Sequence, residues 1–164
     1  MGDSSMRFRL IFAGLLALSG LQSCASPPPP QPPTVVNISI TTTADDNPTV
    51  DNQGAPLALR VYQLAGTANF SAAEFFPLFN DDASTLKTDL VHRDDFLLAP
   101  HASKTLTLMP KDNVASIGVF GAYRAFQTSA WRASVDVAPH KTTNVTVTAG
   151  HDGLVLKSEV VTAK

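Results

Sequence analysis

The stretch that decides the fold is Leu57 to Leu64, which reads LALRVYQL. Leu57, Leu59 and Val61 alternate with other residues, so one face of the segment is continuously apolar. A period of two is typical of a β-strand that buries one face. The segment therefore predicts a strand that packs against a core.

The residues before this strand predict another strand and a long loop. Residues 34–43 read TVVNISITTT, and Val36, Ile38 and Ile40 fall on one face. Residues 44–56 read ADDNPTVDNQGAP, show no periodicity and are rich in turn-forming Asn, Asp, Pro and Gly. This connection is longer than an ordinary hairpin loop, and long loops in compact domains are commonly functional. It is the first candidate site.

The residues after the strand predict a helical region over residues 70–91. Ser71 and Glu74 have the spacing of a capping box, in which each side chain satisfies a free backbone N–H at the start of a helix. Pro77 lies inside the region and predicts a short or kinked helix. The apolar stripe either packs on a sheet or forms a lipid- or partner-binding face. Its members are Phe75, Phe76, Leu78 and Phe79.

The rest of the chain alternates short apolar segments with turn residues. The segment 115–123, ASIGVFGAY, predicts a strand buried on both faces, and Gly150-His151-Asp152-Gly153 predicts a tight hairpin. Together with the two earlier strands, this pattern predicts about eight strands with one helical insertion, which is an antiparallel β-sandwich. The strands predicted after the helical region are residues 94–98, 103–109, 115–123, 129–137, 144–148 and 154–161.

The N-terminal segment has the pattern of a bacterial lipoprotein signal. Two arginines precede an apolar run over residues 10–21, which would span about 18 Å as a helix, short of a roughly 30 Å hydrocarbon core. Residues 21–24, LQSC, resemble the lipobox, in which the Cys is acylated and becomes the mature N-terminus. Cys24 is the single cysteine of the chain. We predict a signal peptide over residues 1–23, with an ordinary secretory signal as the alternative.

An acylated Cys24 would tether the protein to a membrane without spanning it. Ala25 and Ser26 follow, and the Asp that signals inner-membrane retention in lipoprotein families is absent at these positions, so the periplasmic face of the outer membrane is expected. Residues 25–33, ASPPPPQPP, predict a proline-rich spacer of about 28 Å. Residues 34–164 are predicted to form the β-sandwich domain. The covalent lipid is the one cofactor-like group that we expect.

Composition and motifs argue against several classes of function. The formal net charge of −2 gives no basic patch for nucleic acid, and acylation of Cys24 leaves no thiol for a disulfide. The sequence contains no G-x-S-x-G nucleophile elbow and no Gly-rich phosphate loop. Asp45, Asp46 and Asp51 lack the spacing of a calcium-binding loop. We therefore predict neither an enzyme nor a metal site. The histidines, none of them at metal-ligand spacing, are His92, His101, His140 and His151.

Several short motifs accompany the lipobox and the spacer. They are Asn47-Pro48, Gly54-Ala55-Pro56, Leu59 to Leu64, Phe70-Ser71, Glu74 to Phe76, Asp94 to Pro100, Ile117 to Val119 and Tyr123-Arg124. Taken together, these features resemble the outer-membrane lipoproteins of the type VI secretion system, the TssJ, SciN or VasD family. The resemblance covers most of the chain after the signal peptide and implies a transthyretin-like sandwich of two four-stranded sheets with a helical insertion.

The resemblance also implies a function. Members of this family anchor a trans-envelope complex by binding the periplasmic C-terminal region of the large inner-membrane subunit, TssM, through the loop between the first two strands. In this sequence that loop is residues 44–56. Our hypothesis is that residues 45–51 dominate recognition, with Val50 as the apolar contact, and that no nucleic acid or small-molecule substrate is bound. The predicted partner-binding residues are Asp45, Asp46, Asn47, Pro48, Thr49, Val50, Asp51, Asn52, Gln53 and Gly54.

Two other classes of function remain open at this point. A periplasmic ligand-binding or transport lipoprotein would hold an apolar pocket between the Phe-rich helix and the sheet. A cell-wall enzyme would need a cleft in which His and carboxylate side chains converge. His92, Asp94 and Asp95 form the one local cluster of that kind.

Overall fold

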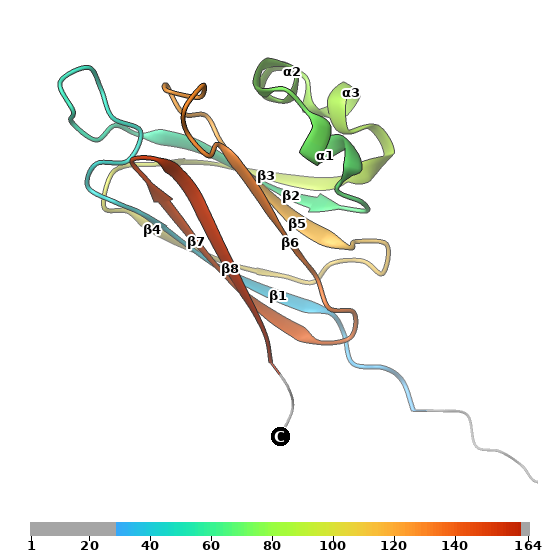
Figure 1. Cartoon of the computed structure of the whole chain (residues 1–164). Helices are drawn as coiled ribbons and strands as arrows, with labels where there is room; N and C mark the ends of the chain where they lie inside the picture. The colour runs from blue at the N-terminus through green and yellow to red at the C-terminus, as the bar shows by residue number, and fades with distance from the viewer. Residues whose placement is uncertain (1–28, 162–164) are drawn as a thin grey trace, which may run out of the picture. The chain divides into compact units, whose positions relative to one another are not determined.

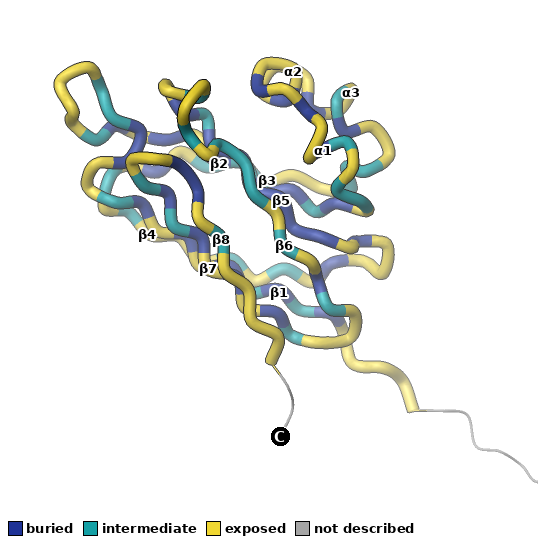
Figure 2. Tube along the Cα trace, viewed as in Figure 1, coloured by how far each residue is buried: buried dark blue, intermediate teal, exposed yellow. Residues whose placement is uncertain are grey.

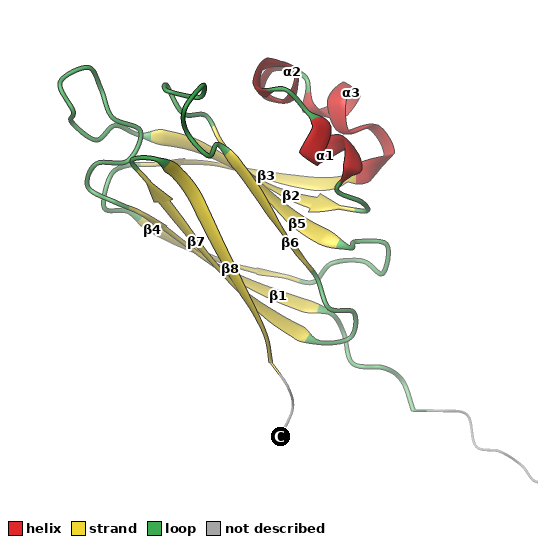
Figure 3. Cartoon of the chain, viewed as in Figure 1, coloured by secondary structure: helices red, strands yellow, loops and turns green. Residues whose placement is uncertain are grey.

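The computed structural model describes residues 29–161, so the predicted signal peptide and Cys24 lie outside the described residues. The sandwich belongs to a compact unit that starts at Gln31. Within the described residues, no helix is long and apolar enough to cross a membrane. The elements (Figures 1 and 3) are β1 (Val35–Thr42), β2 (Leu57–Leu64), α1 (Ala68–Ala72), α2 (Phe75–Asn80), α3 (Asp82–Leu86), a 3₁₀ turn (Lys87–Asp89), β3 (Leu90–Leu98), β4 (Ser103–Leu108), β5 (Ser116–Gly121), β6 (Arg132–Asp136), β7 (Thr142–Gly150) and β8 (Gly153–Val161).

The eight strands form two four-stranded sheets, in the orders β4-β1-β7-β8 and β3-β2-β5-β6. This arrangement confirms the predicted sandwich, with the helical insertion between the second and third strands. Among these strands the neighbours are antiparallel except for β1 and β7, which run parallel from Val35 opposite Thr142 to Thr42 opposite Ala149. All strands of the second sheet lie between β1 and β7 in the sequence. No local sequence pattern therefore predicts this parallel pair.

The main core lies between the two sheets, where the strands turn their buried faces toward each other (Figure 2). The alternation predicted for β1 and β2 is confirmed, and every residue of β5 is buried, as its uninterrupted apolar run predicted. A fully buried Val, Leu or Ile side chain contributes about 1.5–3 kcal/mol. The alternating side chains of β1 and β2 in this core, each at most 1% exposed, are Val36, Ile38, Ile40, Leu57, Leu59 and Val61.

A smaller core lies on the outer face of β2 and β5, beneath the helices. Tyr62 and Leu64 of β2 point to this side and pack with Phe70 of α1 and Leu78 of α2. Gly118 of β5 allows the close approach, because a Cβ there would lie 2.9 Å from Leu64 Cδ1 and 3.1 Å from the Phe70 ring. The helices therefore cover a strand that already faces the main core with its other side.

The helical region begins differently from the prediction. α1 starts at Ala68 and already contains Ser71, whose N–H donates to Thr67 O at 2.8 Å, while Glu74 makes no side-chain cap. The predicted capping box is therefore wrong. Glu74 instead precedes α2, and Pro77 falls in the first turn of that helix, where a backbone N–H needs no helical partner. Pro77 is thus accommodated without a kink.

The helical region also ends earlier than predicted. The carboxylate of Asp81 accepts a hydrogen bond from Ser84 N–H at 3.1 Å and so caps α3. β3 then begins at Leu90 and not at residue 94, because pairing with β2 continues past an irregularity at Gln63 to place Leu90 opposite Leu64. The sequence did not indicate this longer strand, because residues 90–93 show no apolar alternation. An edge strand can form without such alternation.

Candidate interaction site

One end of the sandwich gathers four connections between strands (Figure 1). Backbone hydrogen bonds join them, including Ala130 N–H to Asp152 O at 2.9 Å and His101 N–H to Thr43 O at 3.3 Å. The chain enters β1 at the other end of that strand, about 26 Å away for its eight residues. The four connections are the β1–β2 loop (43–56), the β3–β4 loop (99–102), the β5–β6 loop (122–131) and the β7–β8 turn (151–152).

The β1–β2 loop is the longest of the four and is folded on itself. Thr49 N–H donates to Gln53 O at 2.8 Å, and Asn52 N–H donates to Thr49 O at 3.0 Å. Asn52 adopts a φ of 56°, a left-handed conformation that Asn tolerates better than most residues. Closer to the sandwich, Ala55 N–H donates to Asp46 O at 3.0 Å. The loop is therefore a small hydrogen-bonded hairpin.

The base of this loop is buried. Asp46 is 0% exposed and Asn47 is 4% exposed. The Asn47 side chain donates from Nδ2 to Pro56 O at 3.0 Å and accepts at Oδ1 from Arg124 N–H at 2.9 Å. Asn47 thus ties the β1–β2 loop to the β5–β6 loop. Two of the predicted partner-binding residues, Asp46 and Asn47, are therefore buried at the base of the loop, and the side chain of Asn47 supports it through these hydrogen bonds.

The tip of the loop is exposed. Val50 is 98% exposed, more than any other large hydrophobic side chain in the described residues. A single exposed valine is unremarkable on an ordinary surface. Here it sits on a turn that is already ordered, and an ordered contact residue loses little conformational entropy on binding. Of the predicted set, the exposed members are Asp45, Val50, Asp51, Asn52 and Gln53, and the half-buried members are Pro48, Thr49 and Gly54.

Asp46 is a buried carboxylate without a hydrogen-bond partner. Neither of its side-chain oxygens, nor the buried hydroxyl of Tyr123, is paired within residues 29–161. Burial, followed by the negative charge of Asp45, raises the pKa of Asp46 above its usual range. Burial and the nearby Asp46 likewise raise the pKa of the Tyr123 phenol. An ionised Asp46 therefore destabilises the folded loop.

We expect Asp46→Asn to stabilise the protein at neutral pH by about 1 kcal/mol. Because the folded-state pKa of Asp46 is raised, the folded protein holds this proton more tightly than the unfolded chain does. Stability therefore falls as the pH rises from the ordinary carboxyl value through the raised one. The gain in melting temperature should be present at pH 7 and shrink on acidification through that interval. Asp51→Asn, on the exposed tip, is the control, and a less stable Asp46→Asn protein at pH 7 would contradict this prediction.

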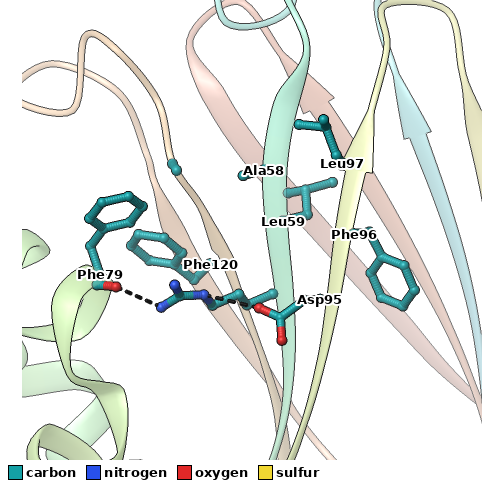
Figure 4. A pocket seen from close by; sticks show the side chains of 9 residues that line it. Ala58, Leu59, Phe79, Asp95, Phe96, Leu97 and Phe120 are labelled. Atoms are coloured by element: carbon teal, nitrogen blue, oxygen red, sulfur yellow. Dashed lines mark hydrogen bonds and ion pairs between the residues drawn. The ribbon is translucent and has the colours of Figure 1, made fainter.

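An open hollow of about 320 Å³ lies beside the helices, on the outer face of β2 and β3 (Figure 4). Arg60 crosses it, with Nε 3.2 Å from Asp95 Oδ1 and Nη1 donating to Phe79 O at 3.0 Å. The alternative function of a ligand carrier would need an apolar pocket between the Phe-rich helix and the sheet. Aromatic rings fill that space, with the Phe75 and Phe120 centroids 5.3 Å apart. The hollow itself is open and holds an ion pair.

The His-carboxylate cluster considered for a hydrolase lies on the edge strand β3. His92 Nε2 is 3.5 Å from Asp94 Oδ1, and the His92 side chain is 58% exposed. Asp95 points to the other face of the strand, where its Oδ2 lies 2.8 Å from Arg93 Nε. The three residues therefore do not converge. Over residues 29–161, no group of three His, Cys, Asp or Glu side chains is placed to hold a metal ion.

The family model of the type VI secretion lipoproteins, which include VasD, EvfM and TssJ, matches residues 34–152. The chain belongs to the type VI secretion lipoprotein family. The match begins one residue before β1 and ends in the β7–β8 turn, so it includes the whole β1–β2 loop. The family predicted from the sequence is confirmed.

Two solved structures of type VI lipoproteins are similar to this chain. The lipoprotein TssJ1 from Pseudomonas aeruginosa is 31% identical, with a TM-score of 0.76, and the alignment covers 80% of this chain and 100% of that one. Lip from Serratia marcescens, a membrane-bound component of the type VI secretion system, is 26% identical, with a TM-score of 0.70 over 76% of this chain and 98% of that one. These similarities confirm the predicted fold of this type VI lipoprotein.

A third structure shares the fold at lower identity. A chain in a structure described as the T6SS protein TssM C-terminal domain (869–1107) from EAEC is 20% identical, with a TM-score of 0.59 over 76% of this chain and 98% of that one. No curated protein sequence matched this type VI lipoprotein.

The LRVYQL strand of this type VI lipoprotein holds the helices in place. Tyr62 Oη donates to Asp82 Oδ2 at 2.9 Å, and Arg93 Nη1 donates to both carboxylate oxygens of Asp82, at 2.9 and 2.8 Å. Arg60 Nη1 lies 3.6 Å from Asp82 and donates to Leu78 O at 3.1 Å. Asp82 is the first residue of α3, and no sequence motif marks it as a partner of these side chains. Its partners are 20 and 11 residues away, beyond the reach of local spacing rules.

Proposed function

We propose that this type VI secretion lipoprotein anchors a trans-envelope complex at the outer membrane by binding the periplasmic C-terminal region of a TssM-type inner-membrane subunit. Membership of the type VI secretion lipoprotein family supports a role in this secretion system. The observation that carries the proposed site is the fully exposed Val50 at the tip of the ordered β1–β2 loop. This tip projects from the end of the sandwich that lies away from the N-terminal entry of β1 (Figure 1).

The exposed tip is the part of the loop that we assign to the contact. Val50 would enter an apolar depression on the partner, with Asp51 and Gln53 around it in the polar rim that interfaces commonly have. Asn47 would act indirectly, because its hydrogen bond from Arg124 N–H holds the hairpin on the sandwich, and Asp46 is buried too deeply for a direct contact. Of the ten predicted partner-binding residues, we therefore assign the contact to the exposed ones, which a partner can reach.

We propose that the protein works by binding and not by catalysis. Loops carried on a rigid scaffold are where binding residues collect, and the β1–β2 loop has internal hydrogen bonds and a connection to Arg124. The tether would confine the protein to one membrane surface, which raises the effective concentration of a partner that reaches the same surface. Modest affinity would then be sufficient for assembly.

The lipid on Cys24 is central to this proposal, and a substitution there tests it. In cells that lack the native copy, the protein with Cys24→Ser should be found in the soluble periplasmic fraction. Type VI secretion should fall to the level of cells without the protein, because an unanchored domain cannot transmit a connection to the outer membrane. The measurements are membrane fractionation and the release of a type VI substrate into the medium.

The substitution Ala25→Asp distinguishes the effect of acylation from the effect of the membrane in which the protein is located. This variant keeps Cys24 but carries the residue that signals inner-membrane retention, so it should remain membrane-bound, move to the inner-membrane fraction and lose secretion. Ser26→Ala is the matched control and should behave as the native protein. Normal secretion by the Cys24→Ser protein would overturn the anchoring role.

A further inference from the structure

β8 is an edge strand with an unusually regular free side. It pairs with β7 without interruption, from Gly153 opposite Gly150 to Val161 opposite Thr142. It is the last strand of its sheet, and its sequence GLVLKSEVV contains no proline. Natural edge strands are usually shortened, bulged or interrupted by proline, because a long regular edge can pair with another chain.

The backbone groups on this free side can be identified. Leu154 N–H points away from β7 and donates to Ala130 O at 2.7 Å. Its opposite residue, Ala149, directs its carbonyl to Thr43 N–H at 2.9 Å, also away from the β7–β8 ladder. Because the direction alternates along a strand, the N–H and C=O groups of residues 156, 158 and 160 also face outward. Among the described residues, no backbone hydrogen bond outside the ladder reaches these three.

Most residues of the same segment are exposed (Figure 2). Val155 is 56% exposed, Val160 is 40% exposed and Val161 is 45% exposed. Leu156 is half-buried at the border of the main core, and the strand beyond it is uncovered on both faces. β8 therefore combines unpaired backbone groups with apolar side chains that solvent reaches.

We propose that β8 pairs with β8 of a second copy of this chain, antiparallel and centred on Ser158. In this register the outward groups of Ser158 face each other, and those of Leu156 face those of Val160 of the second copy. Lys157 then stands opposite Glu159 of the second copy, in a pair that is not backbone-bonded and whose side chains lie closest. The β4-β1-β7-β8 sheets of the two copies would join into one continuous sheet of eight strands.

The sequence of β8 is self-complementary about Ser158. Going outward, Lys157 meets Glu159, Leu156 meets Val160, and Val155 meets Val161, so charge meets opposite charge and apolar meets apolar. Moving the centre by one residue would set Lys157 against Lys157, or Glu159 against Glu159, and like charges directly opposite are unfavourable. The charges therefore select one register and favour a second copy as the occupant of this edge.

The pairing goes beyond the proposed function and does not depend on which partner the β1–β2 loop binds. A single pair of strands is a small interface, so association in dilute solution is expected to be weak. Two copies tethered to one membrane are held at a higher effective concentration, which favours pairing. The test is therefore best made in cells with the full-length protein.

Cysteine cross-linking reads the register directly. With Ser158→Cys, the two Cα atoms would lie about 5.5 Å apart across the two-fold axis, within the range that a disulfide spans. With Val155→Cys, an exposed position on the same strand, the matching cysteines would lie about 20 Å apart. Mild oxidation should give about fivefold or more covalent dimer with Ser158→Cys than with Val155→Cys, against the background set by the unmodified chain.

Charge reversal tests the register independently. In the Ser158→Cys background, Lys157→Glu should lower the yield of dimer about two- to tenfold, because it puts like charges opposite each other. Adding Glu159→Lys should restore the yield. Equal cross-linking at positions 155 and 158, a swapped pair that does not recover, or a product whose mass is not twice that of the chain would each overturn the proposal.

Discussion

The protein with Phe75→Ala is expected to lose about 3–5 kcal/mol of its free energy of unfolding. Phe75 is 9% exposed and lies at the centre of the aromatic cluster beneath α2. Its ring centroid is 4.4 Å from Phe126, 5.3 Å from Phe120 and 5.3 Å from Trp131. Removing this ring leaves a cavity where α2, β5 and the β5–β6 loop meet, so several elements lose contacts at once.

Phe76→Ala is the matched control, because Phe76 is the adjacent residue of the same type and is 55% exposed. It should cost less than about 1 kcal/mol, since solvent already reaches most of its ring. Urea unfolding followed by the fluorescence of Trp131, the single tryptophan, compares the two variants. Similar losses for both would mean that the stripe is not divided into a buried and an exposed side as described.

The different burial of Phe75 and Phe76 shows which features of the fold a local sequence pattern can predict. The period of two placed β2 at its observed bounds and gave the correct buried face of β1, because each strand carries its own signal. The Phe-rich stripe carried no such signal, since its helix is only six residues long and the preceding Ser71 belongs to another helix. Which phenylalanine is buried depends on Phe126 and Trp131, which come much later in the chain.

The length of the β1–β2 loop and the family resemblance predicted the candidate site. They did not predict which residues of the loop are buried and which are exposed. Residues in a loop follow no periodic rule, so nothing local separates the buried Asn47 from the exposed Val50. Asn47 accepts its hydrogen bond from the N–H of Arg124, which lies 77 residues later in the sequence. The same limit applies to the parallel β1–β7 pair and to the ion pairs of Asp82, all of which join distant segments.

Replacing the exposed tip of the β1–β2 loop is expected to weaken partner binding by about 30-fold or more. The variant combines Val50→Ser, Asp51→Ser and Gln53→Ser, so it removes the side chains that a partner can reach. It keeps Thr49 and Asn52, whose backbone hydrogen bond closes the turn. The base of the loop is also unchanged, so the melting temperature should stay within a few degrees of the native value.

A matched control changes an equally exposed loop at the other end of the sandwich. Residues Lys111, Asp112 and Asn113 lie in the β4–β5 connection, close to the end where Val36 pairs with Leu108. Their replacement by Ser should leave binding within about twofold of native, because exposed residues outside a contact contribute little. This control separates a loss of the tip from a general effect of surface substitutions.

The anchoring function is tested most directly by calorimetric titration of the full-length lipoprotein with the periplasmic C-terminal region of the TssM-type subunit from the same cell. We expect saturable binding by the native protein and by the Lys111, Asp112 and Asn113 variant, and a loss of affinity of about 30-fold or more for the tip variant. Undiminished binding by the tip variant would move the interface away from the β1–β2 loop. Absence of binding by the native protein would contradict the anchoring function itself.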